Sequence, residues 1–143
     1  MKVNKRHEAR CAAVQALYQW QHNPEPANEL IKQFMTDHDM QNVSVDYFAE
    51  LVRGVTQHHV ELDELYKPYL DRLPSQLTPI ELAALRLGTY ELRDRLDVPY
   101  KVVINEATEV SKKFGPVDAH KYINAVLDKL AGKLRLAEKQ FKK

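Results

Sequence analysis

VPYKVVINEATEVSKKFGPVDAHKYINAVLDKLA, residues 98–131, is the stretch that decides the fold of this chain. Apolar residues in its first half recur every three or four positions, which is the period of an amphipathic α-helix. A Gly-Pro pair at 115–116 then interrupts the pattern, because glycine tolerates the left-handed conformation that often ends a helix and proline cannot continue one. A second helix is expected after Asp118, a good N-cap, with Val117 and Tyr122 placed as a hydrophobic staple. The sequence therefore predicts two helices joined by a sharp turn.

Four lysines of this helical pair lie outside the apolar stripes and are not needed by the core. Phe114 and Tyr122 flank the turn at the edges of the apolar stripes. Cations, aromatic rings and a helix N-terminus close together suit a nucleic-acid backbone with a stacked base. A solvated helix face beside two core rings explains the same pattern, so both interpretations stay open. The lysines concerned are Lys112, Lys113, Lys121 and Lys129.

Length and composition indicate one soluble, helical domain. A chain of 143 residues with 44% hydrophobic and 29% charged residues can bury a single sizeable core. No apolar run is as long as a membrane span, and the N-terminus lacks the apolar core of a signal peptide. Cys11, the single cysteine, excludes an internal disulfide and fits a reducing cytoplasm. Only four glycines and no alternating β-branched segments favour an all-α chain.

Charge is distributed unevenly along the chain. The net charge of +1 hides basic ends and an acidic middle, since residues 23–66 hold nine acidic residues against two basic ones. Cations crowd the start of the first expected helix, residues 5–22, where they oppose the helix dipole. This crowding suits an RNA-binding arm and equally a frayed, solvated terminus. The cations in question are Lys2, Lys5, Arg6 and Arg10.

Further helices follow from capping and breaking residues. Pro24 and Pro26 precede a short helix, and Ser44 opens a longer pattern that we expect to break into two helices near the His58-His59 pair. Thr78-Pro79-Ile80-Glu81 predicts a capping box and a helix to about residue 95, in which Gly88 indicates the close approach of another helix.

No motif for catalysis, metal or cofactor binding is found. The chain lacks a phosphate-binding loop, a dinucleotide fingerprint, a nucleophile elbow and a zinc motif. His58 and His59 point about 100° apart on a helix and have no partners at metal-ligand spacing. Glu106 and Glu109 are expected to be solvated, and Cys11 to be a small buried residue. We therefore expect no enzyme activity and no cofactor.

Five runs of sequence strongly resemble the bacterial NusB family of transcription antitermination proteins, and together they cover nearly the whole chain. The resemblance implies an all-α fold of about seven helices in two packed bundles, an N-terminal one over about 1–73 and a C-terminal one over about 74–135, with a basic tail at 136–143. The runs are AVQALYQW (13–20), VDYFAELVRGV (45–55), ELAALRLGTYEL (81–92), DVPYKVVINEATEVSKKFG (97–115) and HKYINAVLDKLA (120–131).

The family resemblance also implies a function and a set of site residues. Members of the family are not enzymes; they pair with NusE, which is also a small-subunit ribosomal protein, and bind boxA-type single-stranded RNA during ribosomal RNA transcription. Other Nus factors and RNA polymerase are then indirect partners. The surface facing NusE is expected to include Tyr18 and Glu81. The RNA-binding residues implied are Lys2, Lys5, Arg6, Arg10, Tyr69, Phe114, Asp118, Lys121 and Tyr122.

The N-terminal arm departs from the arginine-rich form that is common in the family. Only Arg6 and Arg10 are arginines, and lysine offers a point charge instead of a planar fork. Asp118 is an acid on the expected RNA face, where capping of the following helix would occupy part of its carboxylate. Two alternatives also fit the sequence: an RNA-binding domain related to that of a ribosomal RNA cytosine methyltransferase, and a structural homodimer with weak RNA affinity.

Overall fold

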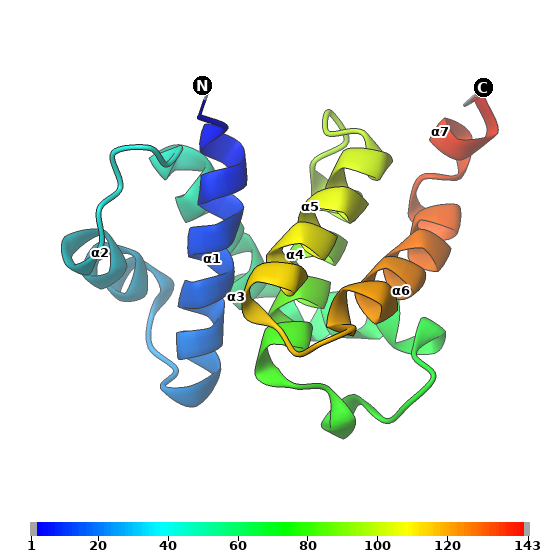
Figure 1. Ribbon diagram of the computed structural model, residues 1–143, viewed down its shortest axis with the longest axis horizontal. Coiled ribbons are helices and arrows are strands. Elements are labelled where there is room, and N and C mark those ends of the chain that lie inside the picture. The colour runs from blue at the N-terminus through cyan, green and yellow to red at the C-terminus, as the bar shows by residue number, and fades with distance from the viewer. Residues whose placement is uncertain (1–2, 142–143) are drawn as a thin grey trace.

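The chain is all-helical in the computed structural model, whose described residues are 3–141 (Figure 1). This range contains seven α-helices and two single-turn 3-10 helices, η1 and η2, and no strand. The predicted all-α class and the expected number of helices are therefore confirmed. The elements are α1 (Lys5–His22), α2 (Ala27–Asp37), α3 (Val45–Tyr66), η1 (Lys67–Tyr69), η2 (Pro74–Gln76), α4 (Pro79–Asp94), α5 (Tyr100–Phe114), α6 (Ala119–Leu134) and α7 (Leu136–Phe141).

Two clusters of buried side chains form the core. The first joins α1, α2 and α3, and the second joins α5 and α6. Figure 1 shows α1 and α2 on one side of the molecule and α5, α6 and α7 on the other, with α4 between them. Helix α4 supplies Leu87 to the first cluster and Leu85 to the second. Because α4 packs into both, the division expected near residue 73 is not marked by a gap in packing and stays a prediction.

The start of α4 follows the sequence prediction closely. The Glu81 N–H donates to Thr78 Oγ1 (3.2 Å), and the Thr78 N–H donates to Glu81 Oε1 (2.9 Å), which completes the capping box. Further along α4, a Cβ added at Gly88 would lie 2.6 Å from Leu127 Cδ1 of α6. The close approach of another helix at Gly88 is therefore confirmed.

Helix α3 contains the break that the sequence predicts near the His58-His59 pair. The element spans Val45–Tyr66, but His58 has non-helical dihedral angles (φ −115°, ψ 16°), so two helical segments meet at a kink there. The predicted break is therefore confirmed as a kink inside α3.

The α5–α6 turn differs from the prediction in its details. Gly115 has φ −96° and ψ 176°, so it is not left-handed; instead, a Cβ there would lie 2.8 Å from the Ser111 carbonyl oxygen. Asp118 takes the left-handed conformation (φ 68°), which aspartate tolerates better than most residues. Its side chain makes no capping hydrogen bond, and Val117 is 93% exposed. The predicted carboxylate cap and the Val117–Tyr122 staple are therefore wrong.

The C-terminal segment is more ordered than the basic tail predicted at 136–143. Residues Leu136–Phe141 form α7, while Lys142 and Lys143 lie outside the described residues. The buried guanidinium of Arg135 fixes the start of this segment against the end of α4, because carbonyl oxygens there and just beyond it accept its hydrogen bonds. It donates to the carbonyl oxygens of Glu91, Leu92, Arg95 and Val98 at 2.8–3.1 Å and pairs with the Glu138 carboxylate at 2.6 Å.

Within residues 3–141, no helix is long and apolar enough to cross a membrane. Cys11 is 3% exposed, as predicted for a small buried residue, and burial raises the pKa of its thiol.

Candidate nucleic-acid interface

The N-terminal arm is anchored to the body of the protein at Arg6. Asn4 caps α1, since its Oδ1 accepts a hydrogen bond from the His7 N–H at 3.0 Å. The Arg6 guanidinium lies 4.3 Å from the centre of the Tyr47 ring and 3.9 Å from the Asp97 carboxylate, yet its side chain remains 45% exposed. Lys5 is exposed beside it, and Lys2 lies outside the described residues. Arg6 and Lys5 are therefore placed where a polyanion can reach them.

Arg10 differs from Lys5 and Arg6, the other described cations of this arm, in being buried. Its side chain is 3% exposed and donates three hydrogen bonds of 2.8–3.2 Å to the Glu91 carboxylate, whose side chain is fully buried. Burial opposes the charged guanidinium, but the hydrogen bonds and charge of Glu91 outweigh it and raise the pKa of Arg10. The guanidinium has very little exposed surface to offer, so this burial argues against a direct contact between Arg10 and RNA, which stays a prediction.

The Arg10–Glu91 pair belongs to a buried polar network that sequence analysis did not find. The Tyr47 hydroxyl donates to Glu91, and burial together with that carboxylate raises the pKa of Tyr47. His7 Nδ1 and Arg10 both approach Glu106 Oε1, at 2.7 and 3.3 Å. The Glu106 side chain is thus only 12% exposed, whereas the sequence predicted a solvated carboxylate. The sequence held one signal of this burial. Glu91 follows Gly88 by three positions and Leu87 by four, which places all three on the same buried face of α4.

This network positions the arm. It connects the first turns of α1 to α3, α4 and α5, and so holds Arg6 against Tyr47. Cations at the start of α1 interact unfavourably with the positive end of the helix dipole, and carboxylates of neighbouring helices offset this free-energy cost.

The α5–α6 turn carries the second group of predicted residues. Lys112 and Lys113 are exposed at the end of α5. Lys121 is 74% exposed and lies 3.5 Å from the Asp118 carboxylate, which is itself 68% exposed. An exposed pair of this kind contributes little to stability. Lys121 is therefore free to exchange Asp118 for a phosphate, whereas Asp118, without a capping role, opposes a polyanion nearby.

The two predicted aromatic rings belong to different cores, although they flank one turn. Phe114 packs against the first cluster, while Tyr122 and Tyr69 pack against the second. All three are partly exposed. The guanidinium of Arg72, a residue that sequence analysis did not single out, lies 3.8 Å from the centre of the Tyr122 ring. The turn therefore presents separate rings instead of one aromatic pair.

The arm and the turn lie at opposite ends of α5. Arg6 approaches Asp97 just before α5 begins, and Phe114 is the last residue of that helix. Figure 1 shows the start of α1 at the top of the view and the α5–α6 turn near the bottom. Helix α5 has 15 residues and so spans about 22 Å. A ligand that touches both groups must extend along this helix.

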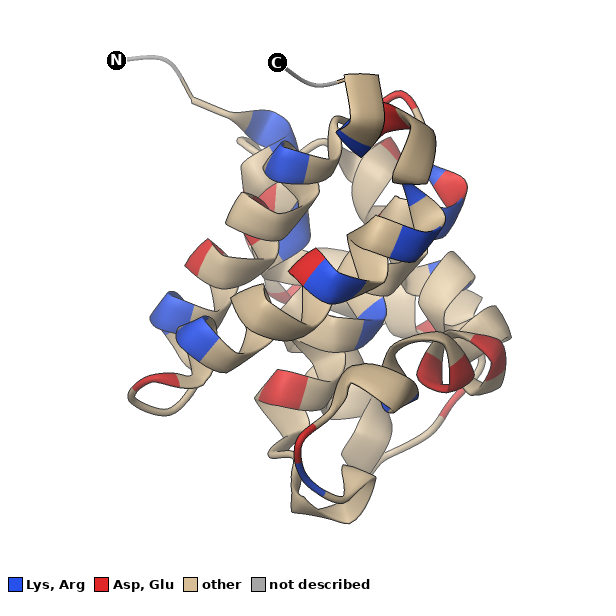
Figure 2. Cartoon of the chain, turned by 90° about the vertical axis from the view of Figure 1, so that its right-hand side faces the viewer, with Lys and Arg blue, Asp and Glu red and all other residues tan. Residues whose placement is uncertain are grey.

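Cations and carboxylates are interspersed around this surface. Figure 2, which faces α6 and α7, shows bands of both charges along these helices. Lys139 lies 3.3 Å from Asp128, and Lys112 lies 3.4 Å from Glu109. These exposed pairs are weak and screened by salt, so their lysines remain available to phosphates. No set of three or more possible metal ligands occurs among residues 3–141.

The residues predicted to face NusE lie on another side of the molecule, where α1 meets α4. Gln21 of α1 donates to the Pro79 carbonyl oxygen at 2.9 Å, which brings the end of α1 to the start of α4. Tyr18 is 42% exposed there, whereas the Glu81 side chain is 6% exposed. Glu81 is therefore committed to its capping box and presents almost no surface to a partner.

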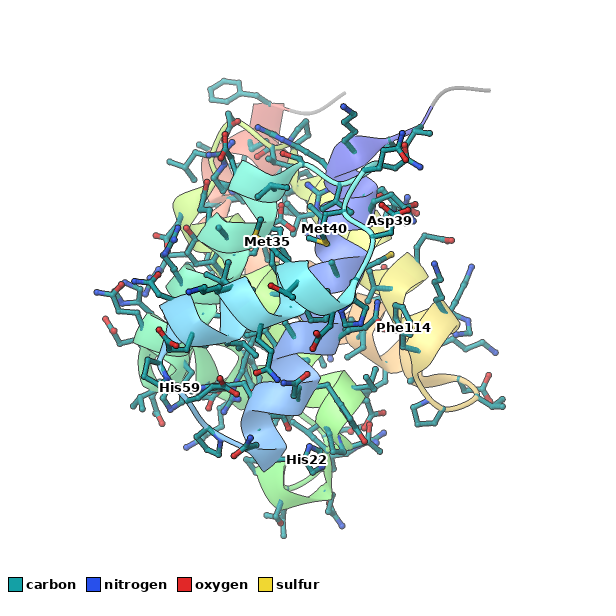
Figure 3. All side chains as sticks on the ribbon, turned by 90° about the vertical axis from the view of Figure 1, so that its left-hand side faces the viewer. His22, Met35, Asp39, Met40, His59 and Phe114 are labelled. Carbon is teal, nitrogen blue, oxygen red and sulfur yellow. The ribbon has the colours of Figure 1, made fainter. Side chains whose placement is uncertain are left out.

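Tyr18 also lines a groove of about 570 Å³. Phe114 and Ile80 lie on its wall, so the groove extends from the expected partner side to the α5–α6 turn. Figure 3 faces this side and labels His22 at the end of α1 and Phe114 at the end of α5. The remaining lining residues are Gln15, Gln19, His22, Asn23, Phe34 and His38.

The fold and this surface define a class of small all-helical proteins that offer cations and aromatic rings to a polyanion. A model of the NusB family matches residues 7–132. The chain belongs to the NusB family. It is 52% identical over 135 residues to the transcription antitermination protein NusB of Idiomarina loihiensis, covering 94% of this chain and 97% of the relative. It is 49% identical over 137 residues to that of Marinobacter nauticus, covering 96% and 87%.

Solved structures give the same result. The chain is similar to T. maritima NusB with a TM-score of 0.82, at 26% identity and over 99% and 100% of the two chains. It is also similar to a chain in a crystal structure of the antitermination factors NusB and NusE in complex with double-stranded RNA. That similarity has a TM-score of 0.74, at 28% identity and over 87% and 93% of the two chains.

Proposed function

We propose that this chain is a non-catalytic transcription antitermination factor that pairs with NusE and binds boxA-type RNA during ribosomal RNA transcription, in the cytoplasm. The observation that carries the proposal is the match to NusB relatives along nearly the whole chain, together with the likeness to a NusB–NusE complex that holds RNA. The exposed cations and rings of the described surface supply the chemistry that RNA binding needs.

RNA binding would use the two ends of α5 differently. At one end, Lys5 and Arg6 would neutralise phosphates, which gives affinity without sequence preference. At the other end, Phe114 and Tyr122 would stack on unpaired bases, and Lys121 would hold a phosphate beside them. Unpaired bases are required for such stacking, which favours a single-stranded ligand, whereas the related complex holds double-stranded RNA.

NusE binding would centre on the exposed ring of Tyr18 and the groove beside it. A tyrosine at the edge of an apolar groove offers both contact area and a polar hydroxyl, as is common at protein interfaces. Glu81 would act through its capping box, which fixes the first turn of α4 and so the position of Ile80 in the groove.

Titration of the purified chain with boxA RNA, with and without NusE, tests this proposal. The boxA strand should bind more tightly than a scrambled strand of the same length, and the annealed boxA duplex should bind more weakly. Equal affinity for boxA and scrambled RNA in the presence of NusE would refute sequence recognition. Transfer of methyl groups from S-adenosylmethionine to ribosomal RNA by the purified chain would refute the non-catalytic role.

A further inference from the structure

We infer that Arg72 is a positioning residue that joins the proposed RNA surface to the start of α4. This inference rests on the proposed function. Arg72 lies in the connection between η1 and η2, and its side chain is 36% exposed. The guanidinium carbon lies 3.8 Å from the centre of the Tyr122 ring, and one guanidinium nitrogen lies 3.9 Å from Glu81 Oε2. One side chain therefore contacts a ring proposed to stack on RNA and a carboxylate on the partner side.

The contact with Tyr122 determines which surface of the ring RNA can use. A guanidinium at 3.8 Å covers one face of the ring, and the attraction between a cation and an aromatic ring holds the two together. Only the remaining exposed part of the ring is left for a base. Tyr122 is partly buried against the second core cluster, and Arg72 adds a restraint on one face of the ring, so that a base can stack without reordering the ring.

The contact with Glu81 fixes Arg72 in turn. Glu81 Oε1 accepts the Thr78 N–H in the capping box, which leaves Oε2 to face Arg72. This carboxylate is almost fully buried, so a nearby cation stabilises its charge more than an exposed pair would. Arg72 is also 3.3 Å from the Asp71 carboxylate. Two carboxylates and one ring thus hold the guanidinium in place, and a change at the start of α4 reaches Tyr122 through it.

The test is an RNA titration of the NusE complex with Arg72→Ala, Arg72→Lys and a matched control, Arg53→Ala. Arg53 is also exposed, but it lies on α3 and donates to Asn28. Arg72→Ala should weaken boxA binding by about three- to thirtyfold, the range of a cation–ring contact. Arg72→Lys should bind boxA RNA nearly as weakly as Arg72→Ala, since lysine lacks the planar fork. Arg53→Ala should bind like the unchanged chain.

Two further measurements separate positioning from direct contact. The salt dependence of binding should be the same for Arg72→Ala and the unchanged chain; a slope smaller by about 0.7 would mean that Arg72 binds a phosphate instead, and would overturn the inference. In a chain that already carries Tyr122→Ala, Arg72→Ala should lower the affinity for boxA RNA no further, because its effect passes through the ring. Additive losses would also overturn the inference.

The link to Glu81 has its own test. Glu81→Gln keeps an oxygen for the Thr78 N–H but removes the charge that faces Arg72. With saturating NusE, Glu81→Gln should weaken RNA binding in a chain that keeps Arg72 and should have no effect on RNA binding in a chain that carries Arg72→Ala. An equal loss in both backgrounds would refute the link. If the unchanged complex fails to bind RNA, the proposed function fails; if it binds and Arg72→Ala binds equally well, only this inference fails.

Discussion

Replacing Arg10 by alanine should destabilise the fold severely without removing a direct RNA contact. The Arg10 and Glu91 side chains are 3% and 0% exposed, and three hydrogen bonds join them. Removing one member of such a pair leaves a buried charge without its partner, which costs about 3–5 kcal/mol. Small domains are stable by only about 5–15 kcal/mol, so a large fraction of the free energy of unfolding should be lost.

Urea unfolding followed by far-ultraviolet circular dichroism measures this loss. With a denaturant dependence of about 2 kcal/mol per molar for a domain of this size, the midpoint should fall by about 2 M. Arg6→Ala is the matched control, because Arg6 is an arginine of the same helix that is 45% exposed. Its free energy of unfolding should change by less than about 1 kcal/mol.

A double substitution tests the reason for the effect. Arg10→Met with Glu91→Gln removes both charges and leaves an oxygen to accept the Tyr47 hydroxyl, so it should recover at least half of the lost stability. An Arg10→Ala variant within about 1 kcal/mol of the unchanged chain would refute the account of this network.

Four other substitutions test the packing and the partner surface. Gly54→Ala should destabilise the protein by about 1–3 kcal/mol in urea unfolding, because an added Cβ would lie 2.2 Å from the Tyr90 ring; Gly132→Ala, with open space around it, should instead stabilise α6 by roughly 0.5–1 kcal/mol. Arg135→Ala should destabilise the protein by about 1–3 kcal/mol for each carbonyl that loses its partner, such as that of Leu92, and retained stability would contradict the role given to the buried guanidinium. Glu81→Lys should remove the capping box, at about 0.5–2 kcal/mol, and weaken NusE binding in calorimetry; unchanged NusE affinity would show that the start of α4 lies outside the interface.

Local sequence signals predicted most of the fold. The Thr78-Pro79 helix start, the close approach at Gly88 and the burial of Cys11 depend on residue type and near neighbours, and all three are found in the structure. The turn at residues 115–118 was harder, because glycine was the obvious left-handed residue and the chain uses Asp118 instead. Backbone geometry at a turn depends on what packs beside it, here Ile80 and Ser111, and the sequence does not show those neighbours.

The candidate site was predicted only in part. Arg6, Lys121 and Tyr18 are exposed, as surface roles require, whereas Arg10 and Glu81 are buried. The sequence grouped Arg10 with the cations at the start of the first helix, but its partner Glu91 is distant in the sequence and comes into contact only through packing. Contacts between distant residues of this kind, including that of Arg72 with Tyr122, cannot be found from the spacing of residues along one chain.

The salt dependence of RNA binding by two variants of the NusE complex tests the central claim most directly. Arg6→Ala should reduce the slope by about 0.7 and weaken boxA and scrambled RNA alike, because a phosphate contact acts by releasing counterions. Tyr122→Ala should lower boxA affinity by about 1–3 kcal/mol with the slope nearly unchanged, since a stacked base carries no counterion. If Tyr122→Ala stays folded and binds boxA like the unchanged chain, or if Arg6→Ala leaves the slope unaltered, the division of α5 into a phosphate-binding end and a base-stacking end is wrong.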